Sequence, residues 1–156
     1  MELVKMSQTK YNDWNDFVDQ SPQGSIYSKT WYLDAFDANY EILSVQNDNE
    51  ILAGIVLCKN KTGLYQNPLL SKYLGVLFKR FEGKNYTIET RKRKTLGLLI
   101  PQLKKHRSFS YNFHPGFCSY LPFYWEGYDC SLQYTYQIDL TNTSKEKILS
   151  IPCFKP

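Results

Sequence analysis

The sequence predicts an α+β or α/β domain built on a mixed, mainly antiparallel sheet flanked by helices. Three observations lead to this fold class. Apolar residues recur at helical spacing near the start of the chain and again after residue 87, two apolar runs between them are separated by turn-prone residues, and aromatic residues alternate with polar ones around position 111. At 156 residues, of which 42% are hydrophobic, the chain has the size of one domain. We expect this domain at residues 1–150 and a short tail at residues 151–156.

The first quarter of the chain is expected to form one strand and two helices. The strand is predicted at residues 2–7. Tyr11, Trp14 and Val18 then recur at helical spacing until Ser21-Pro22 interrupts the pattern, so an amphipathic helix follows the strand. A second, short helix is predicted from about residue 30 to residue 38, because Asn39 is a typical residue at a helix end.

A β-hairpin is the clearest element in the sequence. Apolar runs at residues 40–46 and 51–59 flank Asn47-Asp48-Asn49-Glu50, whose residues favour a turn. Gly54 lies inside the second run. A glycine at such a position indicates either a bulge or the close approach of another group.

Short strands and one long helix are expected after the hairpin. The strands are predicted around residues 64–66 and 74–78, separated by a loop that opens with Pro68. From residue 87 the apolar spacing becomes helical over positions 88, 96, 99 and 103, with Pro101 as the site of a kink. A half-buried strand at 109–113 follows. The last elements are a strand at 134–140 and a helix that Thr143 and Glu146 open as a capping box.

Several short segments carry a family resemblance. They are residues 14–18 (Trp14-Asn15-Asp16-Phe17-Val18), residues 25–31, residues 67–75 and residues 121–140. In the same order along the chain, they resemble segments of the first domain of FemAB-like transferases, which belong to the GNAT superfamily of acyltransferases. The common order makes the resemblance more specific than any one segment does. The GNAT arrangement, in which two early helices precede an antiparallel meander and a later helix packs over it, is similar to the order predicted here.

The resemblance implies a GNAT-like fold and a division of labour between two domains. In FemAB-like transferases the first domain shapes the acceptor channel, while the second usually holds the acyl donor and the reacting centre. The chain is therefore expected to be the amino-terminal, acceptor-side half of an N-acyltransferase or aminoacyltransferase that acts on a cell-envelope or surface-polysaccharide precursor. Acyl-coenzyme A or aminoacyl-tRNA is the implied donor of a full-length relative, and a second GNAT-like domain is an implied partner.

We expect the chain to bind no cofactor by itself. The pyrophosphate of such a donor is held by backbone N–H groups of a turn before a helix, and this turn is usually Gly-rich. Here only residues 81–85, Phe-Glu-Gly-Lys-Asn, come near such a turn. The sequence from Ser144 to Pro156 contains two prolines where the family has a helix that carries basic residues toward the second domain. We therefore expect a truncated chain that is inactive alone; an excised domain and a stand-alone relative are the alternatives.

Aromatic side chains form the predicted acceptor site. Tyrosine, present 13 times, favours positions where one end of the side chain is dry and the other is wet. Six aromatic residues in or beside the family-like segments are predicted to line a channel for a sugar or peptide: Trp31, Tyr65, Tyr73, Tyr120, Phe123 and Trp125. Core packing is the alternative, above all for Trp31. Family members that engage phosphorylated acceptors tend to have a basic residue just after this Trp, and its replacement by Tyr32-Leu33-Asp34 argues against a nucleotide-linked acceptor.

Basic residues form a second predicted site. Clustered cations attract phosphate, so these residues are predicted to contact a phosphorylated acceptor or the anionic surface of the inner membrane. The alternative is a solvated helix face whose cations complement the helix dipole. The predicted anion-binding residues are Arg91, Arg93, Lys104, Lys105 and Arg107.

Composition and spacing argue against several other functions. The net charge of +4, from 19 basic and 15 acidic residues, is too small to indicate nucleic-acid binding. The four cysteines lack the spacing of a zinc site or a redox motif, and neither His106 nor His114 has a Ser or Cys partner at a recognisable spacing. No secretory signal or membrane-spanning stretch is evident, so a cytoplasmic protein is expected. A non-catalytic module that binds a carbohydrate or a protein is the alternative function.

Overall fold

The computed structural model describes residues 1–106 and 108–135. It confirms the predicted fold class, since a mixed, mainly antiparallel sheet is flanked by helices. The two early helices, the antiparallel strands and the later long helix follow one another in the expected order. The elements are β1 (Glu2–Lys5), α1 (Tyr11–Gln20), α2 (Thr30–Asp34), β2 (Asn39–Asn47), β3 (Glu50–Lys59), β4 (Tyr65–Gln66), β5 (Val76–Phe78), α3 (Asn85–Leu103), β6 (Phe109–Ser110) and α4 (Leu121–Trp125), with single 3-10 turns at Gln8–Lys10 and Ile26–Ser28.

The sheet has the order β1-β2-β3-β4-β6, and β5 pairs with β3 farther along the same edge as β4. All pairs are antiparallel except β4 and β6, which run parallel. Because parallel neighbours need a crossover connection, the chain between them passes through α3. The long connection from β4 to β6 therefore places α3 against the sheet.

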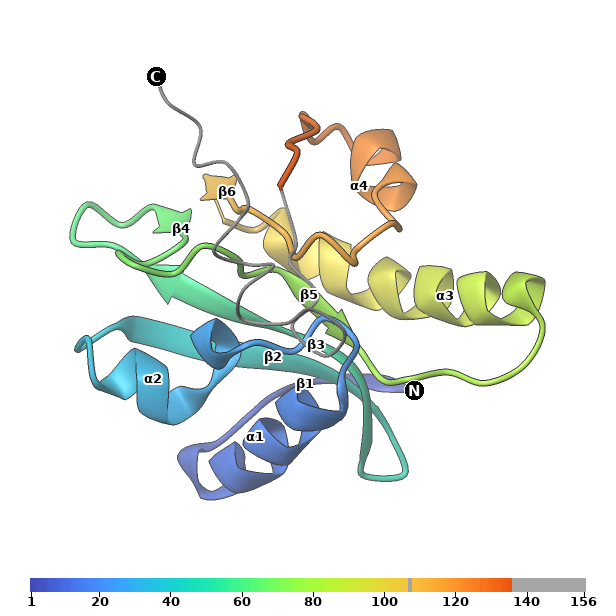
Figure 1. Ribbon diagram of the computed structural model, residues 1–156, viewed down its shortest axis with the longest axis horizontal. Helices are drawn as coiled ribbons and strands as arrows, with labels where there is room; N and C mark the ends of the chain where they lie inside the picture. Colours follow the sequence, from blue (N-terminus) through green and yellow to red (C-terminus); the bar gives the residue numbers. More distant parts are fainter. Residues whose placement is uncertain (107, 136–156) are drawn as a thin grey trace, which may run out of the picture.

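Two layers of helices cover the two faces of the sheet (Figure 1). The first core lies under α3, where Leu96, Leu99 and Leu103 pack with Leu43 and Val45 of β2. The second core lies under α1 and α2, where other residues of β2 and β3 pack against Trp14, Phe17 and Leu33. Successive strand residues point to opposite faces, so the continuous apolar runs of the central hairpin supply both cores.

The predicted hairpin is confirmed, with β2 and β3 joined at Asp48-Asn49. These two residues have φ values of 49° and 67°. Such left-handed values are required at both central residues of a type I′ turn, and Asp and Asn tolerate them better than other residues with a side chain. The sequence of the turn thus explains the tight connection.

The close approach predicted at Gly54 is also confirmed. A Cβ atom at this position would lie 2.5 Å from Cζ3 of Trp14. The indole therefore packs directly on the backbone of β3, and its Nε1 donates a hydrogen bond of 2.8 Å to the carbonyl of Ser28. This contact fixes α1 and the turn before α2 on one face of the sheet.

Several predicted boundaries were wrong. The second helix ends at Asp34 rather than at residue 38, because the chain turns left-handed at Asp37 (φ 47°) and the Ala38 N–H bonds back to Leu33. The long helix begins at Asn85, two residues early, and contains Pro101 in its last turn. The strand expected at residues 109–113 is regular only over Phe109–Ser110.

Strand β6 is shorter than predicted because of a contact at the edge of β3. Cys58 pairs with Tyr40 of β2, but on the other edge of β3, between the pairings with β4 and β5, it has no strand partner. The Tyr111 hydroxyl accepts a hydrogen bond of 2.7 Å from the Cys58 N–H. A side chain thus replaces a ladder bond, and the chain around Tyr111 does not continue as a strand. Tyr134 and Thr135 are not in a strand, and the rest of the predicted strand, with the Thr143–Glu146 capping box, lies outside the described residues.

Candidate functional site

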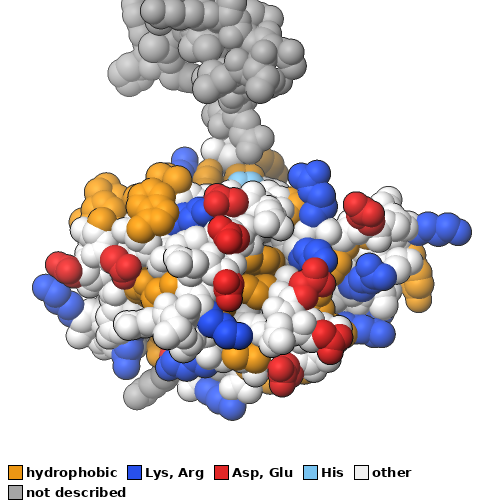
Figure 2. Space-filling model, turned by 90° about the horizontal axis from the view of Figure 1, so that it is seen from below, with side chains coloured by type: hydrophobic (Ala, Val, Ile, Leu, Met, Phe, Trp, Pro, Cys, Tyr) orange, Lys and Arg blue, Asp and Glu red, His pale blue; other side chains and the backbone are white. Residues whose placement is uncertain are grey.

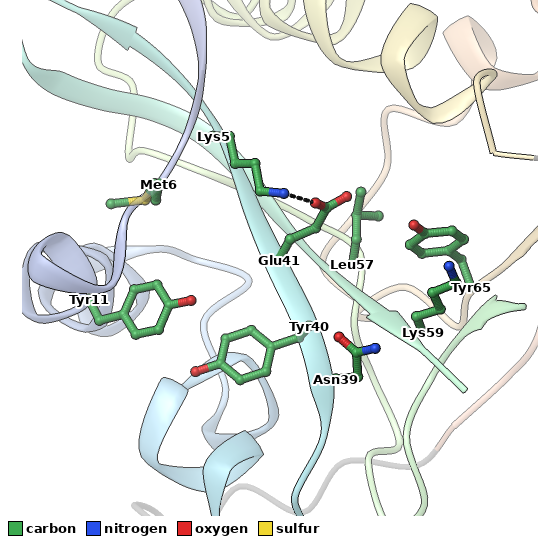
Figure 3. A pocket seen from close by; sticks show the side chains of 9 residues that line it. All are labelled: Lys5, Met6, Tyr11, Asn39, Tyr40, Glu41, Leu57, Lys59 and Tyr65. Carbon is green, nitrogen blue, oxygen red and sulfur yellow. Dashed lines mark hydrogen bonds and ion pairs between the residues drawn. The ribbon is translucent and has the colours of Figure 1, made fainter. Parts of the chain in front are cut away.

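A polar cavity of about 170 Å³ opens at the end of β1 (Figure 3). β1 pairs only with residues 43–46 of β2, so the first residues of β2 extend beyond it without a partner on that side. The chain leaves the sheet at Met6 and turns into α1, and the cavity forms beside this exit. Its lining residues are Lys5, Met6, Tyr11, Asn39, Tyr40, Glu41, Leu57, Lys59 and Tyr65.

An ion pair lies at the centre of this cavity. Lys5 Nζ is 2.5 Å from Glu41 Oε2, and the hydrogen bond with this carboxylate raises the pKa of Lys5. The other oxygen of Glu41 lies 3.9 Å from His106 Nε2. The His106 ring in turn packs on Tyr65, with ring centroids 4.0 Å apart. The carboxylate is therefore surrounded by two basic groups and one aromatic ring.

Two tyrosines form the opposite wall. Tyr11 and Tyr40 stack with ring centroids 5.8 Å apart. The Tyr40 hydroxyl donates a hydrogen bond of 2.8 Å to Asp34 Oδ1. Burial, and then this hydrogen bond to an anion, raise the pKa of Tyr40, so its phenol stays neutral.

The cavity is suited to binding a polar molecule that has a flat face. The tyrosine rings offer apolar surfaces, while Asn39, Glu41 and Lys59 offer donors and acceptors around them. Lys59 Nζ lies 6.0 Å from the Tyr65 ring centroid, and among the residues that the structure describes it forms no ion pair. One ammonium group is thus available for an additional acceptor atom on a ligand.

A second place where ligands often bind is closed in this structure. In open sheets with parallel strands, ligands bind in the crevice beyond the carboxyl ends of the strands. β4 and β6 pair only through Tyr65–Phe109 and Gln66–Ser110, and farther along Asn112 is hydrogen-bonded to Asn67 and Leu74. Aromatic rings fill the space between β5 and the segment after β6: Phe117 stacks on Phe78 at 5.8 Å, and Phe113 packs edge-to-face against Phe117 at 4.7 Å.

Gln23 bridges the two sides of this filled crevice. Its Oε1 accepts a hydrogen bond of 3.1 Å from the Phe78 N–H, and its Nε2 donates one of 3.3 Å to the carbonyl of Gly116. The side chain comes from the turn between α1 and α2 and is almost fully buried. The amide thus holds β5 and the segment after β6 together.

The turn before α3 lies where an anion-binding turn would lie, but it has only some of the features of such a turn. It follows β5 and leads into a helix whose first residues carry no side-chain cap. Gly83 is its single glycine and has a φ of 122°. A helix of 19 residues is about 28 Å long, so this turn and the polar cavity lie near opposite ends of α3.

The structure divides the six predicted aromatic site residues among three places. Tyr65 lines the polar cavity. Trp31 and Tyr73 belong to a chain of aromatic contacts that runs through Tyr32 and Tyr27. Tyr120 and Trp125 lie exposed on and beside α4. Phe123, in the same helix, is only 3% exposed and packs in the core under α3.

Figure 2 shows exposed apolar side chains at the end of the molecule where α2 lies, and Trp31 of α2 is 57% exposed. Leu69 and Leu70, 82% and 67% exposed, extend this apolar surface from the loop after β4. Leu70 has a left-handed φ of 65°, and the Tyr32 hydroxyl donates to its carbonyl at 3.0 Å. The loop is therefore held in one conformation.

The predicted anion-binding residues all lie on or just after α3. Arg91, Arg93, Lys104 and Lys105 are exposed, and Lys104 forms an ion pair with Glu126. Arg107 lies outside the described residues. The cations therefore share one helix but are not gathered around a cavity.

Sequence reasoning missed the ion pair at the cavity centre, Lys5 and Glu41, and the neighbouring His106. Their separation in the sequence gave no spacing to recognise. Only the antiparallel register, which pairs Lys5 with Leu43, brings the lysine beside Glu41. Among residues 1–106 and 108–135 no group of three or more His, Cys, Asp or Glu could hold a metal ion, and no helix there is long and apolar enough to cross a membrane.

Comparisons with known proteins give one structural likeness. No family model matches the chain, and no curated protein matches it. Among solved structures, a ribosomal-protein-alanine N-acetyltransferase from Brucella melitensis biovar Abortus 2308 is similar over 90% of this chain and 100% of that one, with a TM-score of 0.49 and 11% sequence identity.

Proposed function

We propose that this chain is the acceptor-binding, amino-terminal domain of a FemAB-like N-acyltransferase. The order of elements, with two early helices, an antiparallel meander and a crossover helix, supports the acyltransferase kind of fold. The closed crevice carries the more specific proposal. Among the described residues, Gln23 and stacked phenylalanines occupy the space beyond the parallel strands, which supports a role on the acceptor side.

In this proposal the polar cavity holds the acceptor, an amine-bearing sugar or envelope precursor. The tyrosine rings would pack on the faces of a sugar, while Glu41, Asn39 and Lys59 would bond to its hydroxyl and amine groups. A second GNAT-like domain, as a partner, would supply acyl-coenzyme A or aminoacyl-tRNA. In the cytoplasm, the acyl group would then pass from the thioester of coenzyme A, or the ester of aminoacyl-tRNA, to the amine of the acceptor. The amine would lose a proton, and the free thiol or the tRNA hydroxyl would be released.

Ligand-induced stabilisation tests this function. A ligand present at ten times its Kd raises stability by about 1.4 kcal/mol, which corresponds to about 3–6 °C in Tm for a chain of this size. We expect such a rise with glucosamine-type amino sugars and none with acetyl-coenzyme A. A rise with acetyl-coenzyme A and none with any amino sugar would overturn the proposal.

Two pairs of variants assign the binding to the cavity. Glu41→Gln and Tyr65→Ala are expected to abolish the stabilisation by the sugar. Their matched controls, Glu82→Gln and Tyr86→Ala, alter exposed residues near the other end of α3 and should leave it intact. Equal loss in cavity and control variants would show that the sugar binds elsewhere.

A non-catalytic binding module is the second candidate, and the exposed apolar surface at Trp31, Leu69 and Leu70 favours it. The two functions differ in their need for an amine. An acyltransferase acceptor site should bind glucosamine more tightly than N-acetylglucosamine, whose nitrogen is already acylated. Equal affinity for the two sugars would favour the module.

A further inference from the structure

The positive charge of the chain is concentrated on α3. Residues 84–106 contain seven Lys or Arg and one Glu, a net charge of +6. The remaining residues therefore carry −2 of the overall +4. A modest net charge for the whole chain thus hides a strongly basic helix on a slightly acidic molecule.

Most of these cations point to solvent without a partner. Lys94 lies on the side of α3 opposite to its buried leucines, Arg91 and Arg93 flank it, and Lys105 follows the end of the helix. None of the four forms an ion pair with another described residue, whereas Lys92 and Lys104 pair with Glu89 and Glu126. Four unpaired charges on one helix repel one another, and a surface of opposite charge would relieve this cost.

Exposed aromatic and aliphatic side chains lie on α3 and on and beside α4. The segment around α4 is joined to α3 near both ends, since Ser119 Oγ donates to Glu89 and Lys104 pairs with Glu126. Both helices cover the same face of the sheet (Figure 1). The exposed apolar residues of these two segments are Leu98, Tyr120, Leu121, Tyr124 and Trp125, of which Trp125 is 65% exposed.

We propose that this α3–α4 face, formed by Arg91, Arg93, Lys94, Lys105 and the five apolar residues, docks on the surface of an anionic lipid bilayer. Basic side chains near such a surface gain about 1 kcal/mol each, and Trp and Tyr favour the boundary between water and hydrocarbon. Leu98 and Leu121 favour lipid over nucleic acid, because aliphatic side chains cannot stack on bases. This inference concerns residues that do not line the polar cavity, and it stands without the proposed function.

Vesicle sedimentation tests the proposal with the whole chain. We expect it to bind vesicles of phosphatidylglycerol and phosphatidylcholine, but not vesicles of phosphatidylcholine alone. Salt at about 0.5 M should release it, because the Debye length is short at this ionic strength. Replacing both Arg93 and Lys94 by Gln should weaken binding about thirtyfold, since two surface charges are lost. The matched pair Lys10→Gln and Lys61→Gln removes the same charge from other exposed sites and should weaken binding far less.

A pair of tryptophan variants tests the aromatic part. Trp125→Ala should reduce vesicle binding several-fold, whereas Trp31→Ala, which changes a similarly exposed side chain on the opposite face, should not. In a Trp31→Phe variant, a blue shift of the fluorescence on vesicle addition would come from Trp125, because Trp14 is already buried.

Four results would overturn the proposal. They are the absence of binding to anionic vesicles, equal weakening by the two charge-neutralising pairs, loss of binding in Trp31→Ala instead of Trp125→Ala, and tighter binding to duplex DNA than to vesicles at the same salt with the same dependence on Arg93 and Lys94. Unchanged Tm values in all variants would show that the effects are not due to unfolding.

Discussion

Replacing Gln23 by Ala is expected to destabilise the protein strongly, because this amide closes the crevice beyond the parallel strands. The variant leaves the N–H of Phe78 without a partner in a buried position, which costs about 2 kcal/mol. The bond to the carbonyl of Gly116 is worth less, about 0.5–1 kcal/mol, since water can reach this exposed residue. The void left by the shortened side chain adds about 1 kcal/mol.

The total of about 3–4 kcal/mol is a large part of the 5–15 kcal/mol that typically stabilises a domain. Urea unfolding followed by circular dichroism measures it. Gln23→Met, which keeps most of the volume but neither hydrogen bond, should recover only about 1 kcal/mol, and Gln20→Ala, at an exposed position on α1, should cost less than about 0.5 kcal/mol. A loss below about 1 kcal/mol in Gln23→Ala would refute the reasoning.

Three further predictions concern the packing around the sheet. Gly54→Ala should cost about 1–3 kcal/mol of unfolding free energy, because its methyl group would overlap the ring of Trp14; wild-type stability would contradict this packing. Tyr111→Phe should cost about 1–2 kcal/mol in the same assay, since the backbone N–H of Cys58 would lose its partner, and an unchanged value would show that water replaces the hydroxyl. Burial lowers the pKa of His114 below its value of 6.5 in the unfolded chain, so the unfolded state binds more protons and stability should fall as the pH drops from 7 to 5. His114→Asn should flatten this dependence, and an equally steep one in the variant would assign it to other groups.

The parts of the fold that depend on local chemistry could be predicted from the sequence. Asp48-Asn49 between two apolar runs identified the hairpin because few residues tolerate left-handed backbone. Gly54 indicated either a bulge or a close approach, and the structure shows the close approach, because a side chain would not fit there. Neither inference required knowledge of distant residues, although the identity of the neighbour, Trp14, could not be foreseen.

The parts that depend on contacts between distant residues could not be predicted. Lys5 and Glu41 meet only through the register of β1 on β2, and His106 joins them only because α3 ends nearby. Gln23 is an ordinary polar residue in a turn, and nothing in its sequence context indicates hydrogen bonds to two segments more than 50 residues away. Likewise, Phe123 looked like part of an aromatic binding segment, but its place in α4 turns it into the core.

The distribution of charge over the molecule says more about its partners than the net charge does. The net charge of +4 argued only against nucleic-acid binding, whereas the basic clusters predicted contact with a phosphorylated acceptor or an anionic membrane. The structure collects the charge on one face, because α3 buries its leucines against the sheet and exposes its cations. The local field near a surface depends on this arrangement and not on the sum.

A site-resolved NMR titration tests the central claim most directly, namely that the chain holds an acceptor in the polar cavity and has no open donor groove. In ¹H–¹⁵N spectra, an amino sugar is predicted to shift the amide signals of Glu41, Lys59 and Tyr65, while acetyl-coenzyme A leaves the signals of Gly83 and Asn85 unchanged. Shifts at Gly83 and Asn85 with acetyl-coenzyme A, and none around the cavity with the sugar, would contradict the account.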